Sequence, residues 1–131
     1  MAAANGHESI VSLLISKGAN VDQRTGSGWT GLHQSCHNGH TSCVATLLAA
    51  GADINKHNKY GATPLVMASA AGHLDTVRLL LTSGCSVEAS VPAQYKVCPT
   101  PTMSAALLGH HHVLKVLMEA GAKADKVNLH H

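Results

Sequence analysis

Residues of the types that bind zinc are clustered between positions 33 and 43. The cluster consists of His33, Cys36, His37, His40 and Cys43. Residues three and four positions apart share one face of a helix, and imidazole nitrogens and thiolates are the usual zinc ligands. Gly39 interrupts any helix between the two cysteines, however, so these side chains do not share one continuous face. We therefore expect structural histidines here and no bound metal.

Other residues that could act as metal ligands, nucleophiles or a phosphate-binding loop give weaker signals. His110 is followed by His111 and His112, which begin an expected second helix at its exposed first turn. A cysteine nucleophile needs an oriented base, and neither Cys36 nor Cys43 has an Asn or Asp placed to orient one. The glycines within residues 25–28 follow no strand, so they predict a turn and not a phosphate-binding loop. The sequence thus predicts neither an enzyme nor a cofactor.

Composition narrows the class of protein further. The 131 residues are 45% hydrophobic and 12% charged, and the formal net charge is +2. Such a chain folds and lacks the basic excess of a nucleic-acid binder. Its apolar runs are too short to span a membrane, and its four cysteines form no CxxC pair. We expect an intracellular protein with reduced thiols, cytoplasmic or nuclear, with no nucleic-acid or membrane partner.

The elements that position these residues recur with a fixed period. Gly-His occurs at residues 6, 39, 72 and 109, and Gly followed by Ala or Cys occurs at 18, 51, 84 and 121. In both series the first three copies are 33 residues apart and the fourth follows after 37. The sequence thus predicts one domain over 1–127, with a partial repeat 1–24, repeats 25–57, 58–90 and 95–127, and an insertion at 91–94. The tail 128–131 has the composition of an affinity-tag remnant.

Each copy has the pattern of two helices joined by a turn. Thr30, Thr63 and Thr100 stand at expected helix starts, and glycines end the first helix about eight residues later. The second helix carries long aliphatic side chains at helical spacing, which we expect to be buried between copies. These are Val44, Leu47 and Leu48, then Val77, Leu80 and Leu81, then Leu114, Leu117 and Met118.

Thr63-Pro64-Leu65-Val66-Met67-Ala68 resembles the T-P-L-H-x-A signature of the ankyrin-repeat family, whose period is 33 residues. The resemblance covers nearly the whole chain. It implies an all-α solenoid of helix-turn-helix units joined by β-hairpin-like turns, which binds another protein. It also implies structural roles for His33 and His40, because the family pattern has His at both positions.

Two departures from the family pattern concern the ends of the chain. Residues 1–5 align with the middle of a first helix, and the last helix is apolar where a capping repeat would be polar. We therefore expect further ankyrin repeats in a longer scaffold or adaptor.

By the same resemblance, a partner lies in a concave groove lined by the turn tips and the first helices. The expected contact residues are Ser27, Trp29, His37, Asn38, Lys59, Tyr60, Ala62, Ala70, Ala71, Lys96, Val97, Leu107 and Leu108. Trp29 and Tyr60 are two of three aromatic residues, and exposed aromatic side chains often dominate binding. Two alternatives stay open: a methyl-lysine reader that uses this aromatic pair, and a purely structural spacer.

Two smaller features complete the expectations. The insertion and Cys98 predict a longer, irregular turn over residues 91–99 that takes part in binding. Asn55, in Asp53-Ile54-Asn55 with Leu47 eight residues earlier, resembles the asparagine that is hydroxylated in many ankyrin repeats.

Overall fold

The computed structural model describes residues 8–18, 20–23, 26, 28–86 and 100–128, with backbone only for 8, 10 and 122–128. This part of the chain contains seven helices and no strand. The helices are α1 (Glu8–Ser16), α2 (Gly31–Asn38), α3 (Thr41–Ala49), α4 (Pro64–Ala71), α5 (Leu74–Thr82), α6 (Pro101–Leu107) and α7 (His111–Asn128). The expected all-α solenoid is confirmed.

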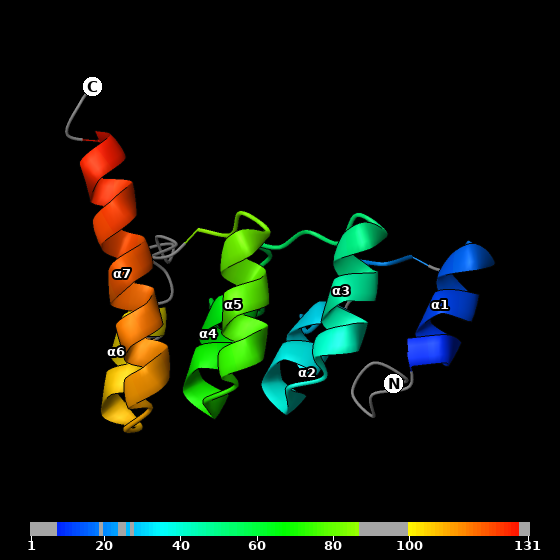
Figure 1. Cartoon of the computed structure of the whole chain (residues 1–131). Coiled ribbons are helices and arrows are strands. Elements are labelled where there is room, and N and C mark those ends of the chain that lie inside the picture. The colour runs from blue at the N-terminus through cyan, green and yellow to red at the C-terminus, as the bar shows by residue number, and fades with distance from the viewer. Residues whose placement is uncertain (1–7, 19, 24–25, 27, 87–99, 129–131) are drawn as a thin grey trace.

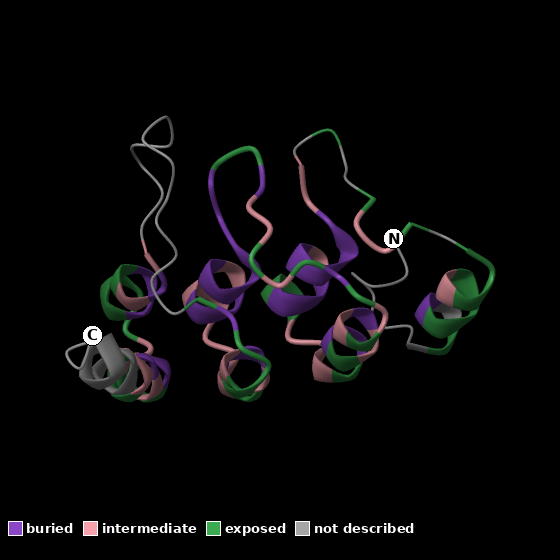
Figure 2. Cartoon of the chain, turned by 90° about the horizontal axis from the view of Figure 1, so that it is seen from above, coloured by how far each residue is buried: buried purple, intermediate pink, exposed green. Residues whose placement is uncertain are grey.

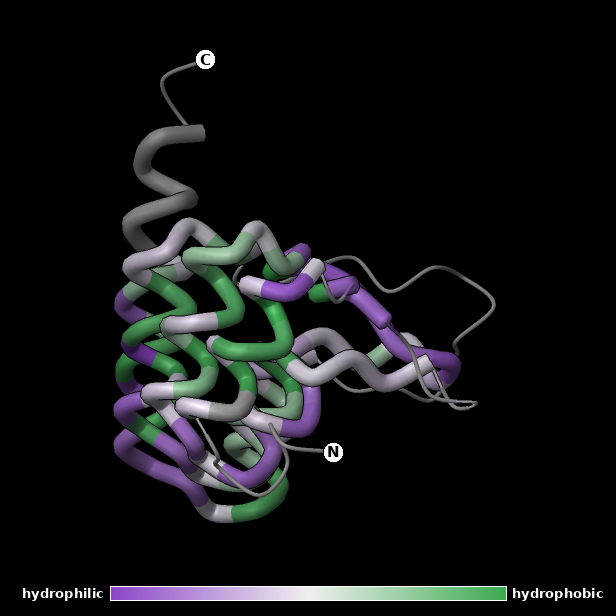
Figure 3. Tube along the Cα trace, turned by 90° about the vertical axis from the view of Figure 1, so that its right-hand side faces the viewer, coloured by the Kyte–Doolittle hydropathy of each residue, from purple (hydrophilic) through white to green (hydrophobic). Residues whose placement is uncertain are grey.

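The helices form two rows (Figures 1 and 2). The first helices of successive repeats pack side by side, α2 on α4 and α4 on α6, and the second helices form the other row in the order α1, α3, α5, α7. The described parts of the connections between α1 and α2 and between α3 and α4 project sideways beyond the row of first helices (Figure 3). We call these connections fingers. One side of the molecule is therefore built from fingers and first helices, which we call the finger face.

Local capping explains where the first helices begin and end. Thr30, Thr63 and Thr100 each accept a hydrogen bond through the side-chain oxygen from the backbone N–H three residues later. This contact satisfies one of the free donors of the first turn. Gly39 and Gly72 end their helices with φ of 73° and 77°, a left-handed conformation that favours glycine. These predicted boundaries are confirmed.

A continuous apolar core runs between the two rows. The fully buried side chains include Leu32, Leu65, Leu80 and Leu117, one from each of four helices. In Figure 3 hydrophobic residues recur within the stacked helices. The prediction that the second-helix aliphatics are all buried is wrong for Met118, which is 60% exposed. Its side chain lies on the last helix, where no further described repeat covers it.

The last helix also differs from its counterparts. Gly51 and Gly84 have φ of 92° and 91° just after α3 and α5, where these helices end. Gly121 occupies the same place in the fourth copy, but α7 continues through it to Asn128. No helix among the described residues is long and apolar enough to cross a bilayer.

The finger over residues 53–62 is held by one asparagine. The side-chain carbonyl oxygen of Asn58 accepts hydrogen bonds from the backbone N–H of Tyr60 (2.8 Å) and of Ala62 (3.0 Å). The N–H of Asn58 donates in turn to the carbonyl of Ala62 at 2.9 Å. These bonds close a hairpin-like turn. The longer turn expected over residues 91–99 lies outside the described residues.

Successive repeats meet closely where a glycine faces a histidine ring. A Cβ atom built on Gly39 would lie 2.6 Å from the Nδ1 of His73, and one built on Gly72 would lie 2.6 Å from the Nδ1 of His110. The Nε2 atoms of the same rings lie 3.0 Å from the carbonyl of His37 and 2.9 Å from that of Ala70. The rings are thus fixed on both sides, and only glycine fits beneath them.

We expect Gly39→Ala to destabilise the chain more than Gly51→Ala. Both substitutions place a side chain at positive φ, which costs about 1–2 kcal/mol. Only the Cβ at Gly39 also collides with a ring, whereas one at Gly51 meets nothing within 4 Å. Overpacking of this kind adds about 1–3 kcal/mol. Urea denaturation followed by circular dichroism measures both differences, and equal losses would show that the His73 ring yields freely.

Candidate functional site

Trp29 is partly buried at the base of a finger, where it packs on histidine rings of α2. Its ring centroid lies 5.7 Å from that of His37, at an interplanar angle of 80°, and 6.3 Å from that of His33, at 46°. An edge-to-face arrangement like that with His37 is favourable for aromatic pairs. Trp29 thus links the finger to the exposed end of the first helix.

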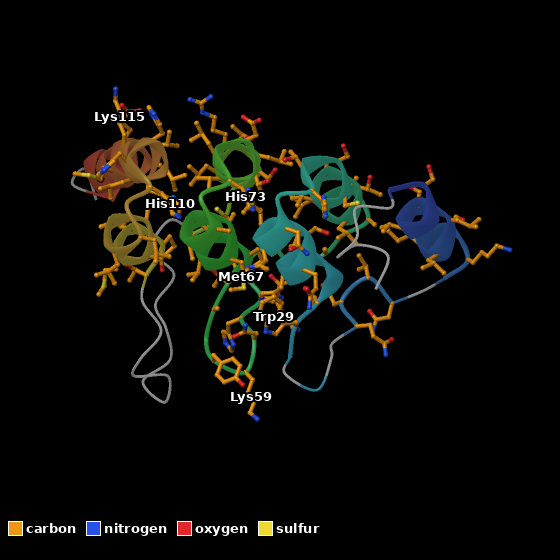
Figure 4. The ribbon with its side chains drawn as sticks, turned by 90° about the horizontal axis from the view of Figure 1, so that it is seen from below. Trp29, Lys59, Met67, His73, His110 and Lys115 are labelled. Carbon is orange, nitrogen blue, oxygen red and sulfur yellow. The ribbon has the colours of Figure 1, made fainter. Side chains whose placement is uncertain are left out.

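The neighbouring finger presents a cation and an aromatic ring. Tyr60 is 61% exposed and Lys59 is also exposed. In Figure 4 Lys59 lies at the outer end of its finger, while Lys115 lies on the opposite side of the molecule. Ala62, which was expected to contact a partner, is only 6% exposed. Its backbone is hydrogen-bonded within the finger, so this residue supports the turn from inside.

The first helices offer different surfaces along the stack. His37 and Asn38 at the end of α2 are exposed, whereas Ala70 and Ala71 at the end of α4 are half-buried. The corresponding residues of the fourth copy are the most apolar: Leu107 is 75% exposed and Leu108, just after α6, is 59% exposed. The surface at these corresponding positions thus changes from polar to apolar along the stack. Ser27, Lys96 and Val97 lie outside the described residues.

Buried His33 joins two repeats. Its Nδ1 accepts a hydrogen bond from the backbone N–H of Thr30 at 3.1 Å, so Nε2 carries the proton and donates to the carbonyl of Ala62 at 3.0 Å. This pattern fits the neutral ring. With both nitrogens engaged, His33 is not placed to ligate a metal. His73 and His110, labelled in Figure 4, also join repeats, through hydrogen bonds to the carbonyls of His37 and Ala70. The recurring Gly-His pair was a signal for this role in the sequence, but neither residue was among the predicted site residues.

The described cysteines are buried, and two of them are poor nucleophiles. Cys36, Cys43 and Cys85 are all buried. Burial raises the pKa of Cys36 far above its usual value, with a further contribution from Cys85, and burial raises the pKa of Cys85 to about 11. At neutral pH these two side chains are therefore thiols, whereas a cysteine nucleophile reacts as the thiolate. No group of three or more potential ligands comes together among the described residues.

Asn55 takes part in a contact between repeats. Its side-chain carbonyl oxygen accepts a hydrogen bond from the N–H of Ser86 at 2.9 Å. One repeat earlier, a carboxylate oxygen of Asp22 accepts from the N–H of Asp53 at 3.1 Å. The side chain of Asn55 is exposed, yet its oxygen has a structural role.

A family model of ankyrin repeats in three copies matches residues 1–91, so the chain belongs to the ankyrin-repeat family. No curated protein matches the chain. Beyond residue 91, α6 and α7 continue the same pattern of capped first helix, glycine and second helix. Ankyrin repeats are generally modules of protein–protein interaction and typically carry no enzymatic activity.

We predict that metal removal leaves the fold unchanged, because His33 is already hydrogen-bonded at both nitrogens and Cys36 is a buried thiol. A chelator should therefore leave the melting temperature of the chain where it is, as measured by differential scanning fluorimetry. A fall of several degrees, together with one zinc per chain by elemental analysis, would contradict this expectation.

Proposed function

We propose that the chain binds a partner protein or peptide through its finger face. The main observation in support of this proposal is the packing of Trp29 against His37. This contact offers a rigid, partly exposed aromatic surface beside a finger that presents Tyr60 and Lys59. Large side chains that are already held in place lose little conformational entropy on binding, which is why such residues are frequent binding hot spots.

The chemistry of the finger face also suggests what kind of partner fits. The helices α2, α4 and α6 contain no Asp, Glu, Lys or Arg, and their ionisable groups are His33, His37 and the buried thiol of Cys36, all in α2. The finger over 53–62 adds Asp53, Lys56, His57 and Lys59, of which Lys59 is exposed near the tip. A suitable ligand therefore places apolar side chains along the first helices, most of all beside Leu107 and Leu108, and a polar or acidic group near Lys59.

Nothing specific favours the alternatives of a methyl-lysine reader and a structural spacer. A cage for a methylated ammonium group needs electron-rich ring faces around the cation. The ring partners that the structure gives Trp29 are His33 and His37, and an imidazole ring is a weaker cage wall that can itself become positively charged. The exposed apolar and aromatic side chains of Tyr60, Leu107 and Leu108 are more than a spacer needs.

The proposal is tested by combining Trp29→Ala with Tyr60→Ala. Peptides selected from a displayed random library on the intact chain supply the ligand, and isothermal titration calorimetry measures affinity. Loss of two anchors should weaken binding by at least about thirtyfold, because one hot-spot residue contributes about 2 kcal/mol.

The matched control is Arg78→Ala, since Arg78 is exposed on α5, away from the finger face. It should leave affinity unchanged, and circular dichroism should show that all variants keep their helices. An affinity within a factor of two of the wild type in the double variant would contradict the finger face as the binding site.

We also propose that Asn55 is a site of asparaginyl hydroxylation, on the basis of its sequence context and exposure. Hydroxylation of this side chain would take place beside the hydrogen bond that its oxygen accepts from the N–H of Ser86. Tryptic peptide mass spectrometry should find an added oxygen on Asn55 in protein from cells with active hydroxylase. A wholly unmodified Asn55, beside oxidised sites in other ankyrin proteins of the same cells, would contradict the proposal.

A further inference from the structure

The residue before the glycine that ends each first helix differs from repeat to repeat. The pairs are Asn38–Gly39, Ala71–Gly72 and Leu108–Gly109. An asparagine followed by glycine loses its side-chain amide readily, because glycine has no side chain to hinder attack by its own backbone nitrogen. Asn38 is exposed at the end of α2, so water reaches it. The Asn–Gly pair at residues 5 and 6 lies outside the described residues.

Deamidation at such a pair needs only water as a co-reactant. The backbone nitrogen of Gly39 attacks the side-chain carbonyl carbon of Asn38 and loses its proton to water, and ammonia leaves as a five-membered succinimide ring closes. Water then opens the ring at either carbonyl. One product is aspartate with a normal backbone. The other is isoaspartate, in which the main chain runs through the Cβ atom and is longer by one methylene group.

The folded end of α2 restrains this reaction. The N–H of Gly39 is shared between the carbonyl oxygens of Cys36, at 3.4 Å, and Ser35. Asn38 is the last residue of the helix, and ring closure requires its main chain to leave the helical conformation. The last turn must therefore open first. A donor–acceptor distance of 3.4 Å is long for a hydrogen bond, and helix ends are the parts that fray.

The ring of His73 lies over the same turn. Its Nε2 atom lies 3.0 Å from the carbonyl oxygen of His37, and a Cβ atom built on Gly39 would lie 2.6 Å from its Nδ1 atom. The ring is thus fitted against the residues on both sides of Asn38. Opening of the last turn would break this contact, so His73 slows the reaction.

Isoaspartate at residue 38 does not fit this contact. It inserts one main-chain atom between the carbonyl of His37 and the Cα atom of Gly39, the two groups against which the His73 ring is fitted. The ring has no room to adjust, since even a Cβ atom on Gly39 would collide with it. Aspartate with a normal backbone keeps the spacing and adds only a negative charge.

We propose that Asn38–Gly39 is a site of spontaneous conversion to isoaspartate, which the His73 ring restrains and which releases that ring once formed. The repeat of α2 and α3 then loses one of its links to the repeat of α4 and α5. Hydrolysis of the succinimide does not return asparagine, so the change accumulates with the age of the molecule. The proposal concerns the joint between two repeats and does not depend on partner binding at the finger face.

The first test follows residue 38 while the whole chain is incubated at physiological temperature and mildly alkaline pH. Peptide mass spectrometry, combined with labelling by an isoaspartate methyltransferase, measures the product. Isoaspartate should accumulate faster at residue 38 than at exposed Asn20 and Asn55, which precede valine and lysine. His73→Ala should accelerate conversion about fivefold, the change expected when one hydrogen bond no longer opposes local opening.

The matched control for this variant is His110→Ala. The His110 ring is held in the same way at the next junction, by the carbonyl of Ala70 and against Gly72. This variant loses an equivalent contact away from Asn38, so it should leave the rate at residue 38 unchanged. Circular dichroism should show that both variants keep their helices.

The second test compares two products of equal charge. Chromatography of the aged chain isolates the isoaspartate form, and Asn38→Asp supplies the aspartate form with a normal backbone. The isoaspartate form should melt at least about 3 °C below Asn38→Asp, because only the longer backbone breaks the ring contact. Differential scanning fluorimetry measures both melting temperatures.

Three results would overturn the proposal. The first is the absence of isoaspartate at residue 38 in both the wild type and His73→Ala. The second is equal acceleration by His73→Ala and His110→Ala, which would show that conversion follows general unfolding. The third is an isoaspartate form as stable as Asn38→Asp.

Discussion

The stack depends on the contact between a glycine at the end of one first helix and the histidine ring of the next repeat. At Gly39 and Gly72 the ring lies directly on the backbone, and its Nε2 bonds a carbonyl of the helix below. A contact this close sets both the distance and the register between repeats. Because each repeat touches only its neighbours, stability is built from such interfaces one at a time. The finger face is regular for the same reason.

Much of the fold could be predicted from the sequence because its determinants are local. The N-cap at Thr63 needs only its own hydroxyl and a backbone N–H three residues later, and the left-handed end at Gly72 needs only the absence of a side chain. Such features recur wherever the residues recur. The period therefore predicted the helices. The match of residues 1–91 to a family model of ankyrin repeats confirms the predicted family.

The remaining features depend on what lies next to a residue, and the period does not contain that information. Met118 has the residue type of a buried position but no described repeat beyond it. Ala62 was expected at a turn tip yet is buried, with its N–H bonded to Asn58 and its carbonyl to His33. Gly121 matches two helix-ending glycines and is itself helical. The contact between Trp29 and His37 likewise requires the angle between finger and helix, which is a tertiary property.

The contact between Trp29 and His37 has a spectroscopic consequence. Trp29 is the only tryptophan of the chain, so all indole emission arises at the junction of one finger with one helix. Far-ultraviolet circular dichroism, by contrast, averages over all the helices. In a repeat protein, regions that bury little apolar surface can open before the core does. The two signals therefore separate detachment of this finger from loss of the helical stack, and their midpoints coincide only if the molecule unfolds in a single step.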